Sequence, residues 1–240
     1  MNAILTIAKK EYQLAMRSVT SYIVFVLFLV ISGAAFATTL FKIDLAELRG
    51  IYSIIHLLFI FFIPAITMGS IAKERSSGTI ELLSTLPIRL SQVVWGKILS
   101  AFLQVLTLLA FCLIYFGIVV VLGENIDYGA IVLGFSGLVF AALAYISIGV
   151  FASSLPSNQV LAFVLALVIS GFFYAMRYLL VLMPLSVVRY LQFFSFEYHL
   201  ASFSKGVLDI RDLLFFVAVT LIFAFLAEFN LQSKNMMQER

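Results

Sequence analysis

Six long apolar runs, separated by short polar connections, leave this chain little choice of fold. They cover residues 22–41, 51–71, 98–122, 130–153, 160–183 and 213–229. An α-helix needs roughly 20 apolar residues to cross about 30 Å of hydrocarbon, and every run but the short last one is close to or above that length. None alternates polar and apolar positions as the strands of a membrane barrel do. The sequence therefore predicts an all-α polytopic membrane protein, one transmembrane domain over 1–240 with six transmembrane helices.

The composition supports this class and excludes others. Hydrophobic residues make up 63% of the chain and charged residues 11%, whereas soluble domains carry about 25% charged residues. A net charge of +3, spread along the whole length, does not indicate a nucleic-acid partner. Cys112 is the only cysteine, so an internal disulfide and a cysteine-based metal cluster are both excluded. We expect an inert, buried thiol there, and no cofactor or metal bound by the chain.

The distribution of Lys and Arg predicts the orientation in the membrane. Cytoplasmic connections carry an excess of these residues, and the early loops usually dominate. With six spans, the side that holds both termini has nine Lys and Arg and the opposite side has six. We therefore expect both termini to be cytoplasmic.

The segment 2–17 has the pattern of an interfacial elbow helix. On a helical projection, Lys9, Lys10 and Arg17 fall in one polar arc of about 100° and apolar side chains fill the remainder. Such a helix lies flat on an anionic leaflet, in contact with membrane lipids. Only Glu11 lies on the apolar arc, where a carboxylate needs compensation. It either pairs with a nearby lysine or reaches the headgroups, or it contacts a partner or the cytoplasmic connection.

The connection 73–97, KERSSGTIELLSTLPIRLSQVVWGK, is the longest polar stretch on the predicted cytoplasmic side. Ile80, Leu83 and Leu86 are spaced at i, i+3 and i+6, with Leu82 beside them, which predicts a short helix with one apolar face.

The residues around this short helix supply start and stop signals. Ser77 or Gly78 can cap its N-terminus, and Glu81 in the first turn complements the helix dipole. Pro87 ends it, and Ser91 offers an N-cap for the helix that leads into the third span. Periodicity alone allows two interpretations, an interfacial connector or a coupling helix that docks into a cytoplasmic motor subunit.

The run from Glu74 to Pro87 resembles the E-x-x-x-G-T-x-E-x-L-x-T-x-P signature of ABC-2 type transporter permeases. Six spans, an elbow helix and the chain length are similar to that family along essentially the whole sequence. Two further stretches, 151–163 (FASSLPSNQVLAF) and 204–212 (SKGVLDIRD), resemble the gliding-motility (GldF-type) permeases.

The resemblance implies a subunit of a bacterial inner membrane that hydrolyses nothing itself. It would pair with a second permease copy or a paralogue and dock two copies of an ATP-binding cassette ATPase, which bind the ATP and Mg. Gliding-motility-type systems also imply an auxiliary membrane protein with a large periplasmic part. The implied ATPase-coupling residues are Glu74, Gly78, Thr79, Ile80, Glu81, Leu82, Leu83, Thr85, Leu86 and Pro87. Motion would also pass through the elbow helix with Lys9, Lys10, Glu11 and Arg17.

Several functions stay open at this level. ATP-driven coupling could export a substrate or transmit force to a periplasmic partner. One alternative within the family is a permease for the maturation of periplasmic copper enzymes of the nitrous-oxide reductase type, and another reading is a structural or sensory membrane subunit without transport. An intramembrane hydrolase would need a G-x-S-x-G or H-E-x-x-H motif, and neither occurs. No G-x-x-x-x-G-K-[ST] phosphate-binding loop occurs either, so the motor must be another chain.

A few polar residues fall within or beside the spans. His56 in the second span has no acidic residue in the same span, so we expect a hydrogen-bonded packing histidine rather than a ligand or proton relay. Arg177 is expected to reach the outer interface at the end of the fifth span. The segment 184–212 is rich in aromatic residues and is predicted to be an interfacial or re-entrant segment on the outer face.

Overall fold

The computed structural model describes residues 3–43, 49–78, 89–122, 127–181, 183–184, 187–188 and 191–238. Regular structure in these ranges is helical throughout. The helices are α1 (Ala3–Met16), α2 (Val19–Ile43), α3 (Arg49–Thr67), α4 (Ala72–Ser76), α6 (Leu90–Leu122), α7 (Tyr128–Ser154), α8 (Gln159–Val181), η1 (a 3-10 helix, Gln192–Phe194), α10 (Phe196–Ser204) and α11 (Ile210–Gln238). The predicted all-α membrane fold is confirmed, because six of the helical segments are long and apolar enough to cross a membrane.

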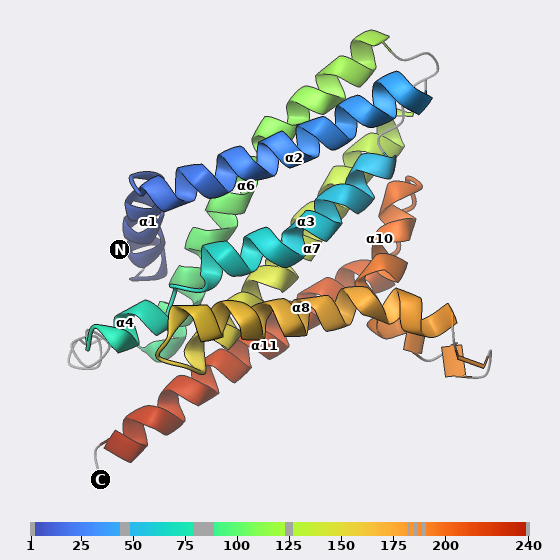
Figure 1. Ribbon diagram of the computed structural model, residues 1–240. Coiled ribbons are helices and arrows are strands. Elements are labelled where there is room, and N and C mark those ends of the chain that lie inside the picture. The colour runs from blue at the N-terminus through green and yellow to red at the C-terminus, as the bar shows by residue number, and fades with distance from the viewer. Residues whose placement is uncertain are drawn as a thin grey trace.

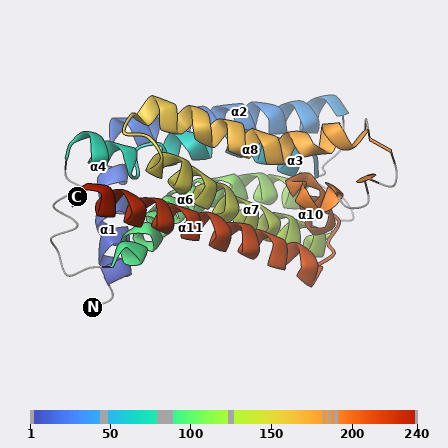
Figure 2. The same ribbon diagram turned by 90° about the horizontal axis from the view of Figure 1, so that it is seen from below.

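The six segments run between the two ends of an elongated bundle (Figures 1 and 2). They are Val19–Thr39, Gly50–Ser76, Leu90–Val121, Tyr128–Ser154, Gln159–Leu180 and Ile210–Lys234. Helix α6, the third span, begins at Leu90, eight residues before the apolar run that starts at 98. Helix α11, the last span, continues past 229 to Gln238. Both are longer than their apolar runs because polar turns extend them beyond the hydrocarbon. The end with α1, α4 and the C-terminus is called the terminal end, and the end with α10 the far end.

Helix α7 forms the centre of the bundle. It contacts α3, α6, α8, α10 and α11, and it is buried along most of its length. Most of its buried residues are small, and Ala141, Ala142, Ala144 and Ser147 are all fully buried. Small residues let helix backbones approach closely in a membrane, where lipid tails are as apolar as leucine and the hydrophobic effect does not drive helices together. The sequence of α7 therefore explains its central position.

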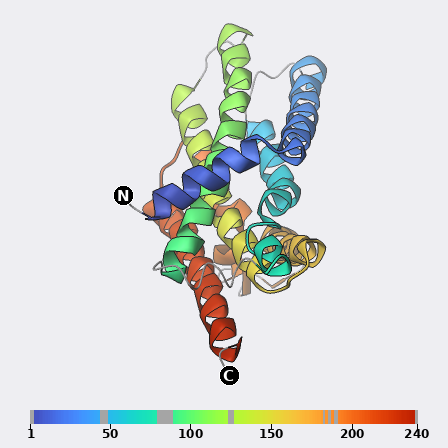
Figure 3. The same ribbon diagram turned by 90° about the vertical axis from the view of Figure 1, so that its left-hand side faces the viewer.

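Helix α1 lies across the terminal end and crosses the direction of the long helices (Figures 1 and 3). It packs mainly against the first half of α6. Gly96 makes this contact possible, because a Cβ atom at that position would lie 2.8 Å from Ile7 Cγ2 and 3.3 Å from the carbonyl oxygen of Ile4. The hydroxyls of Tyr12 and Thr107 form a hydrogen bond of 2.9 Å between the same two helices. The elbow helix is thus fixed to the third span and not only to the membrane surface.

Side-chain caps define several helix starts. Asp127 Oδ1 accepts a hydrogen bond from the backbone N–H of Ala130 at the start of α7. Asn158 and Asp209 accept in the same way from Val160 and Arg211 at the starts of α8 and α11. The predicted N-cap at Ser91 is wrong. Helix α6 starts at Leu90, so Arg89 holds the N-cap position, two residues before Ser91. The side chain of Gln92 accepts from the N–H of Arg89, the reciprocal half of a capping box.

Large apolar side chains cover the outside of the bundle. On α2 they include Val19, Ile23, Val26 and Val30, each at least half exposed. Helices α8 and α11 show similar stripes, with Val164, Val168, Leu214 and Phe225 among them. Exposed apolar area on this scale fits a lipid environment rather than water. Cys112 is a free, fully buried thiol in α6, in agreement with the inert cysteine that the sequence predicted.

Candidate functional site

The strongest polar junction of the terminal end is centred on Lys97 in α6. Its side chain is only 3% exposed, and its ammonium donates to Glu74 Oε1 over 2.7 Å. The same ammonium lies 3.9 Å from Glu11 Oε1 of the elbow helix. Residues 74–87, which resemble the family signature, are called the signature segment. One buried cation therefore connects three elements: the elbow helix, the start of the signature segment, and the third span.

This junction accounts for Glu11. Because α1 packs flat on α6, the carboxylate on the inner side of the elbow helix faces Lys97, a lysine far away in sequence. The other charged elbow residues, Lys9, Lys10 and Arg17, are exposed. Their position suits contact with headgroups or a partner, and the structure brings none of them to the Lys97 junction.

Only part of the predicted coupling segment falls within the described residues. Glu74 lies in α4, Ser77 follows as its C-terminal cap, and Gly78 adopts a left-handed conformation with φ 70°. Ser77 and Gly78 thus end a helix, a role that glycine commonly has after a helix C-terminus. Thr79, Ile80, Glu81, Leu82, Leu83, Thr85, Leu86 and Pro87, and with them the expected short amphipathic helix, lie outside the described residues.

A second connection joins α4 to the end of α7. The hydroxyl of Ser153 donates to the carbonyl of Met68 over 2.8 Å and accepts from the N–H groups of Ile71 and Ala72 over 3.0 and 3.1 Å. Ser153 therefore holds the turn between α3 and α4 and serves the start of α4. Ser153 lies in the stretch 151–163 that resembles the gliding-motility permeases, but no capping or periodicity pattern predicts this contact.

Cations surround the C-terminal carbonyls of α7. Arg75 Nη1 donates to the carbonyl of Ser154 over 2.6 Å, and Lys234 Nζ donates to that of Leu155 over 2.5 Å. Asn230 adds a hydrogen bond of 2.6 Å to Ser154. The last carbonyls of a helix carry partial negative charge, so these donors stabilise the end of α7. Through them α4, α7 and α11 meet beside the signature segment.

The far end has its own polar cluster, which ties α10 to the spans. His56 is 1% exposed, and its Nδ1 donates to Glu197 Oε2 over 3.0 Å. Its other ring nitrogen, Nε2, forms a hydrogen bond of 2.9 Å with the hydroxyl of Tyr145. Glu197 Oε1 also receives a 2.8 Å ion pair from Arg177.

The structure adds partners that the sequence did not identify. His56 is hydrogen-bonded, as expected, and its acidic partner lies in the segment 184–212 rather than in its own span. Arg177, expected to reach the outer interface, pairs with the same carboxylate, and its guanidinium lies 4.8 Å from the ring centroid of Tyr178. Partial burial alone would raise the pKa of Glu197, but the hydrogen bond and charge of His56, together with the charge of Arg177, hold that pKa below its ordinary value of 4.5. Glu197 therefore acts as an ionised latch for α10.

A neighbouring contact closes α10 against the last span. His199 is buried, with Nδ1 2.6 Å from Asp212 Oδ1 in α11 and Nε2 2.9 Å from the carbonyl oxygen of Phe193 in η1. The ring stacks on Phe215 at 3.9 Å between centroids. Part of the predicted outer-face segment is thus folded back into the bundle. Across the described ranges, no group of three or more His, Cys, Asp or Glu residues could hold a metal ion.

The two stretches that suggested a subgroup supply much of this local structure. Asn158 and Asp209 cap helices, Ser153 and Ser154 hold the end of α7, and Asp212 pairs with His199. Their residue types are therefore explained by the fold, and they carry no separate chemistry in the structure.

Comparison with known families agrees with the architecture. A sequence model described as ABC-2 family transporter protein matches residues 6–227, from the elbow helix to the last span. No individual curated protein matches the chain significantly. Six membrane-spanning helices and a family match over nearly the whole chain together identify a multi-pass membrane protein. The chain belongs to the ABC-2 transporter family, as a membrane permease component that works with a separate ATP-binding cassette subunit.

Proposed function

We propose that the terminal end of this permease receives the motion of the cassette ATPase and passes it to the spans through the Lys97 junction. The observation that carries the proposal is the buried ammonium of Lys97, 2.7 Å from Glu74 and 3.9 Å from Glu11. Glu74 opens the signature segment, Glu11 lies on the elbow helix, and Lys97 belongs to the third span. A displacement of the signature segment would therefore reach three elements at once.

In this proposal the permease lies in a bacterial inner membrane. Both termini are cytoplasmic, as the excess of Lys and Arg on that side favours. Two ATPase copies bind ATP and Mg and dock on residues 74–87, with Glu81 as a charge contact and Ile80, Leu83 and Leu86 as apolar anchors. A second permease copy or a paralogue completes the assembly. This chain contributes no catalytic residue.

The α3–α4 turn would transmit a displacement of the signature segment to the helices of the bundle. The N–H groups of Ile71 and Ala72 bind the hydroxyl of Ser153, and Arg75 binds the final carbonyls of α7. Because α7 contacts α3, α6, α8 and α11, a displacement of its end is felt across the core. The work would drive export of a substrate or transmit force to an auxiliary protein with a large periplasmic part.

The subgroup within the ABC-2 family is a separate proposal. The stretches 151–163 and 204–212 favour a gliding-motility-type system, and a permease for copper-enzyme maturation is the alternative. The genes beside this one would decide between them, because each system needs its own ATPase and auxiliary protein.

Docking is tested by cross-linking. A photo-reactive residue at Thr79 or Leu83 of a tagged chain should capture an ATP-binding cassette protein from the native membrane. The same probe at Tyr128, an exposed residue at the start of α7 near the far end, is the control. Failure to capture a cassette protein from either coupling position would overturn the docking proposal.

Coupling is tested on the assembled transporter. Glu81→Lys should abolish stimulation of the ATPase while membrane insertion is retained, and Lys97→Met should weaken stimulation because Glu74 and Glu11 lose their shared cation. Lys205→Met removes one exposed lysine at the far end and should leave stimulation unchanged. If Lys97→Met behaves like Lys205→Met, the junction does not transmit the motion.

A further inference from the structure

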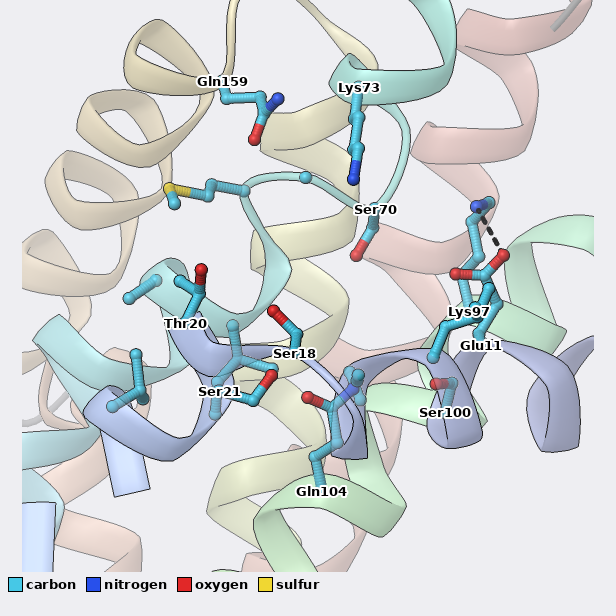
Figure 4. Close-up of a pocket in the computed structure, with 18 residues that line it drawn as sticks. Glu11, Ser18, Thr20, Ser21, Ser70, Lys73, Lys97, Ser100, Gln104 and Gln159 are labelled. Carbon is cyan, nitrogen blue, oxygen red and sulfur yellow. Dashed lines mark ion pairs between the residues drawn. The ribbon is translucent and has the colours of Figure 1, made fainter. Parts of the chain in front are cut away.

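A cavity of about 290 Å³ opens at the terminal end between α1, the first turns of α2, the α3–α4 turn, α6 and the start of α8 (Figure 4). Its lining includes five hydroxyl side chains, two glutamines, two lysines and one glutamate. This is an unusual wall for a protein whose buried residues are mostly apolar. The coupling proposal uses Lys97 and Glu11 but gives the space itself no role.

Two buried polar side chains face this cavity without a partner. Ser100 is 3% exposed and Gln104 is 7% exposed, and both line the cavity from α6, one helical turn apart (Figure 4). Neither side chain makes a hydrogen bond within the part of the chain that the structure describes. Buried hydroxyls and amides are nearly always hydrogen-bonded in folded proteins. The polar atoms of Ser100 and Gln104 open onto the cavity, so a molecule inside it can hydrogen-bond to them.

The charges at the cavity have opposite signs on different walls. Lys73 extends into it from α4, and among the described residues its ammonium has no ion-pair partner (Figure 4). Glu11 enters from α1 beside Lys97, which is 3.9 Å away, too far for a hydrogen bond. One wall thus offers a cation and another a carboxylate able to accept hydrogen bonds.

The position of the cavity in the bundle indicates what kind of ligand it can bind. It lies where α2 enters its apolar span at Val19 and where α1 runs across the end of the bundle, which is the level of the lipid headgroups. The remaining lining is apolar and includes Leu14, Val24, Ile66 and Met68. A ligand at this site meets polar and apolar walls together, as an amphiphile does.

We propose that this cavity binds the headgroup of a zwitterionic aminophospholipid of the phosphatidylethanolamine class. The phosphate is held by the ammonium of Lys73 and by the side-chain donors of Ser100 and Gln104. The primary ammonium of the headgroup donates to Glu11. A primary amine suits this carboxylate better than a quaternary one, because only the primary amine can donate hydrogen bonds. The bound headgroup bridges the elbow helix and α4, the same two elements that Lys97 connects.

Native mass spectrometry of the full chain, purified in detergent and titrated with defined lipids, tests the proposal. One phosphatidylethanolamine should bind per chain, more tightly than phosphatidylglycerol, phosphatidylcholine or inorganic phosphate. Lys73→Gln and Glu11→Gln should each weaken its binding about tenfold, the effect of losing one charge-assisted hydrogen bond. Gln104→Leu, which fills the wall with an apolar side chain, should also weaken it. Lys205→Gln makes the same charge change at the far end and should have no effect.

Each other outcome overturns the assignment. Equal binding of phosphatidylglycerol would show that the carboxylate of Glu11 does not select an amine. Competition by inorganic phosphate at equal affinity would identify a free phosphate site. Retention of phosphatidylethanolamine in Gln104→Leu and Lys73→Gln would place the lipid elsewhere, and the absence of a bound lipid would leave water in the cavity. Labelling of Cys112 by a thiol-reactive dye on heating shows that each variant is folded before it is compared.

Discussion

Gly149 lies where α7 crosses α3, and replacing it with alanine should force the two helices apart. A Cβ atom on Gly149 would lie 2.1 Å from Thr67 Oγ1 and 2.9 Å from Thr67 Cβ. Thr67 is fully buried, and its hydroxyl donates to the carbonyl of Ile63 in its own helix over 2.9 Å. Rotating the threonine side chain would move its oxygen away but would leave Cβ in place. Backbone displacement is therefore required.

The expected loss follows from two opposing effects. Overpacking a well-packed core costs about 1–3 kcal/mol. Alanine in place of glycine within a helix returns about 0.5–1 kcal/mol of conformational entropy. The variant Gly149→Ala should thus lose about 1 kcal/mol of folding free energy, and at most about 2.5 kcal/mol. The matched control is Gly117→Ala in α6, where no atom lies within 4 Å of the added Cβ, so this change should be neutral or slightly stabilising.

The chain carries its own reporter for this measurement. Cys112 is the only cysteine and is fully buried in α6, so a thiol-reactive dye detects unfolding as this side chain becomes exposed. Gly149→Ala should melt below the unmodified chain and Gly117→Ala should not. Adding Thr67→Ala to Gly149→Ala removes the closest atom and should recover part of the loss. If Gly149→Ala melts like Gly117→Ala, the close approach of α3 and α7 is wrong.

The remaining predictions concern the polar contacts at the two ends. Glu197→Gln should cost about 2 kcal/mol, because His56 and Arg177 each lose a charged partner. These partners lower the pKa of Glu197 below 4.5, so the stabilisation is present at neutral pH and is lost as the pH falls below that value. The difference in melting temperature between the unmodified chain and Glu197→Gln should shrink at that low pH. A constant difference would contradict the role of ionised Glu197 in holding α10. Ser153→Ala should cost about 1–3 kcal/mol by leaving the buried N–H groups of the α3–α4 turn unpaired, whereas Ser157→Ala, at an exposed position, should melt normally.

The sequence predicted what depends on local patterns. Six apolar runs became six helices, and the amphipathic pattern of 2–17 became α1 lying across the end of the bundle. Helix ends were predicted less well. Ser91 has a residue type that favours the N-cap, but the capping contact comes from the side chain of Gln92. Helix boundaries are uncertain by one or two residues, so residue type alone does not fix the first turn.

Long-range polar pairs could not be predicted, because no periodicity connects residues in different spans. His56 and Glu197 are 141 positions apart, and they meet only because α10 folds back against α7 and α8. One signal was available: Glu197 is a single carboxylate in a run of aromatic residues, and such a group needs a partner. Glu11 gave the same signal, and there the sequence analysis did expect compensation, though not from Lys97 in α6. The ATPase-coupling residues from Thr79 to Pro87 stay predictions.

The contacts between α3 and α7 indicate which part of the bundle moves as one body. The hydroxyl of Tyr145 binds His56 towards the far end, and that of Ser153 binds the α3–α4 turn at the terminal end. These two residues are eight positions apart in α7, about 12 Å along the helix. Between them, the approach at Gly149 leaves no room for a side chain. A pair of helices that is hydrogen-bonded at both ends and closely packed between them resists bending and sliding. A push on α4 should therefore displace α3 and α7 together, and relative motion should concentrate at α2 and α8, whose outer sides are exposed along most of their length.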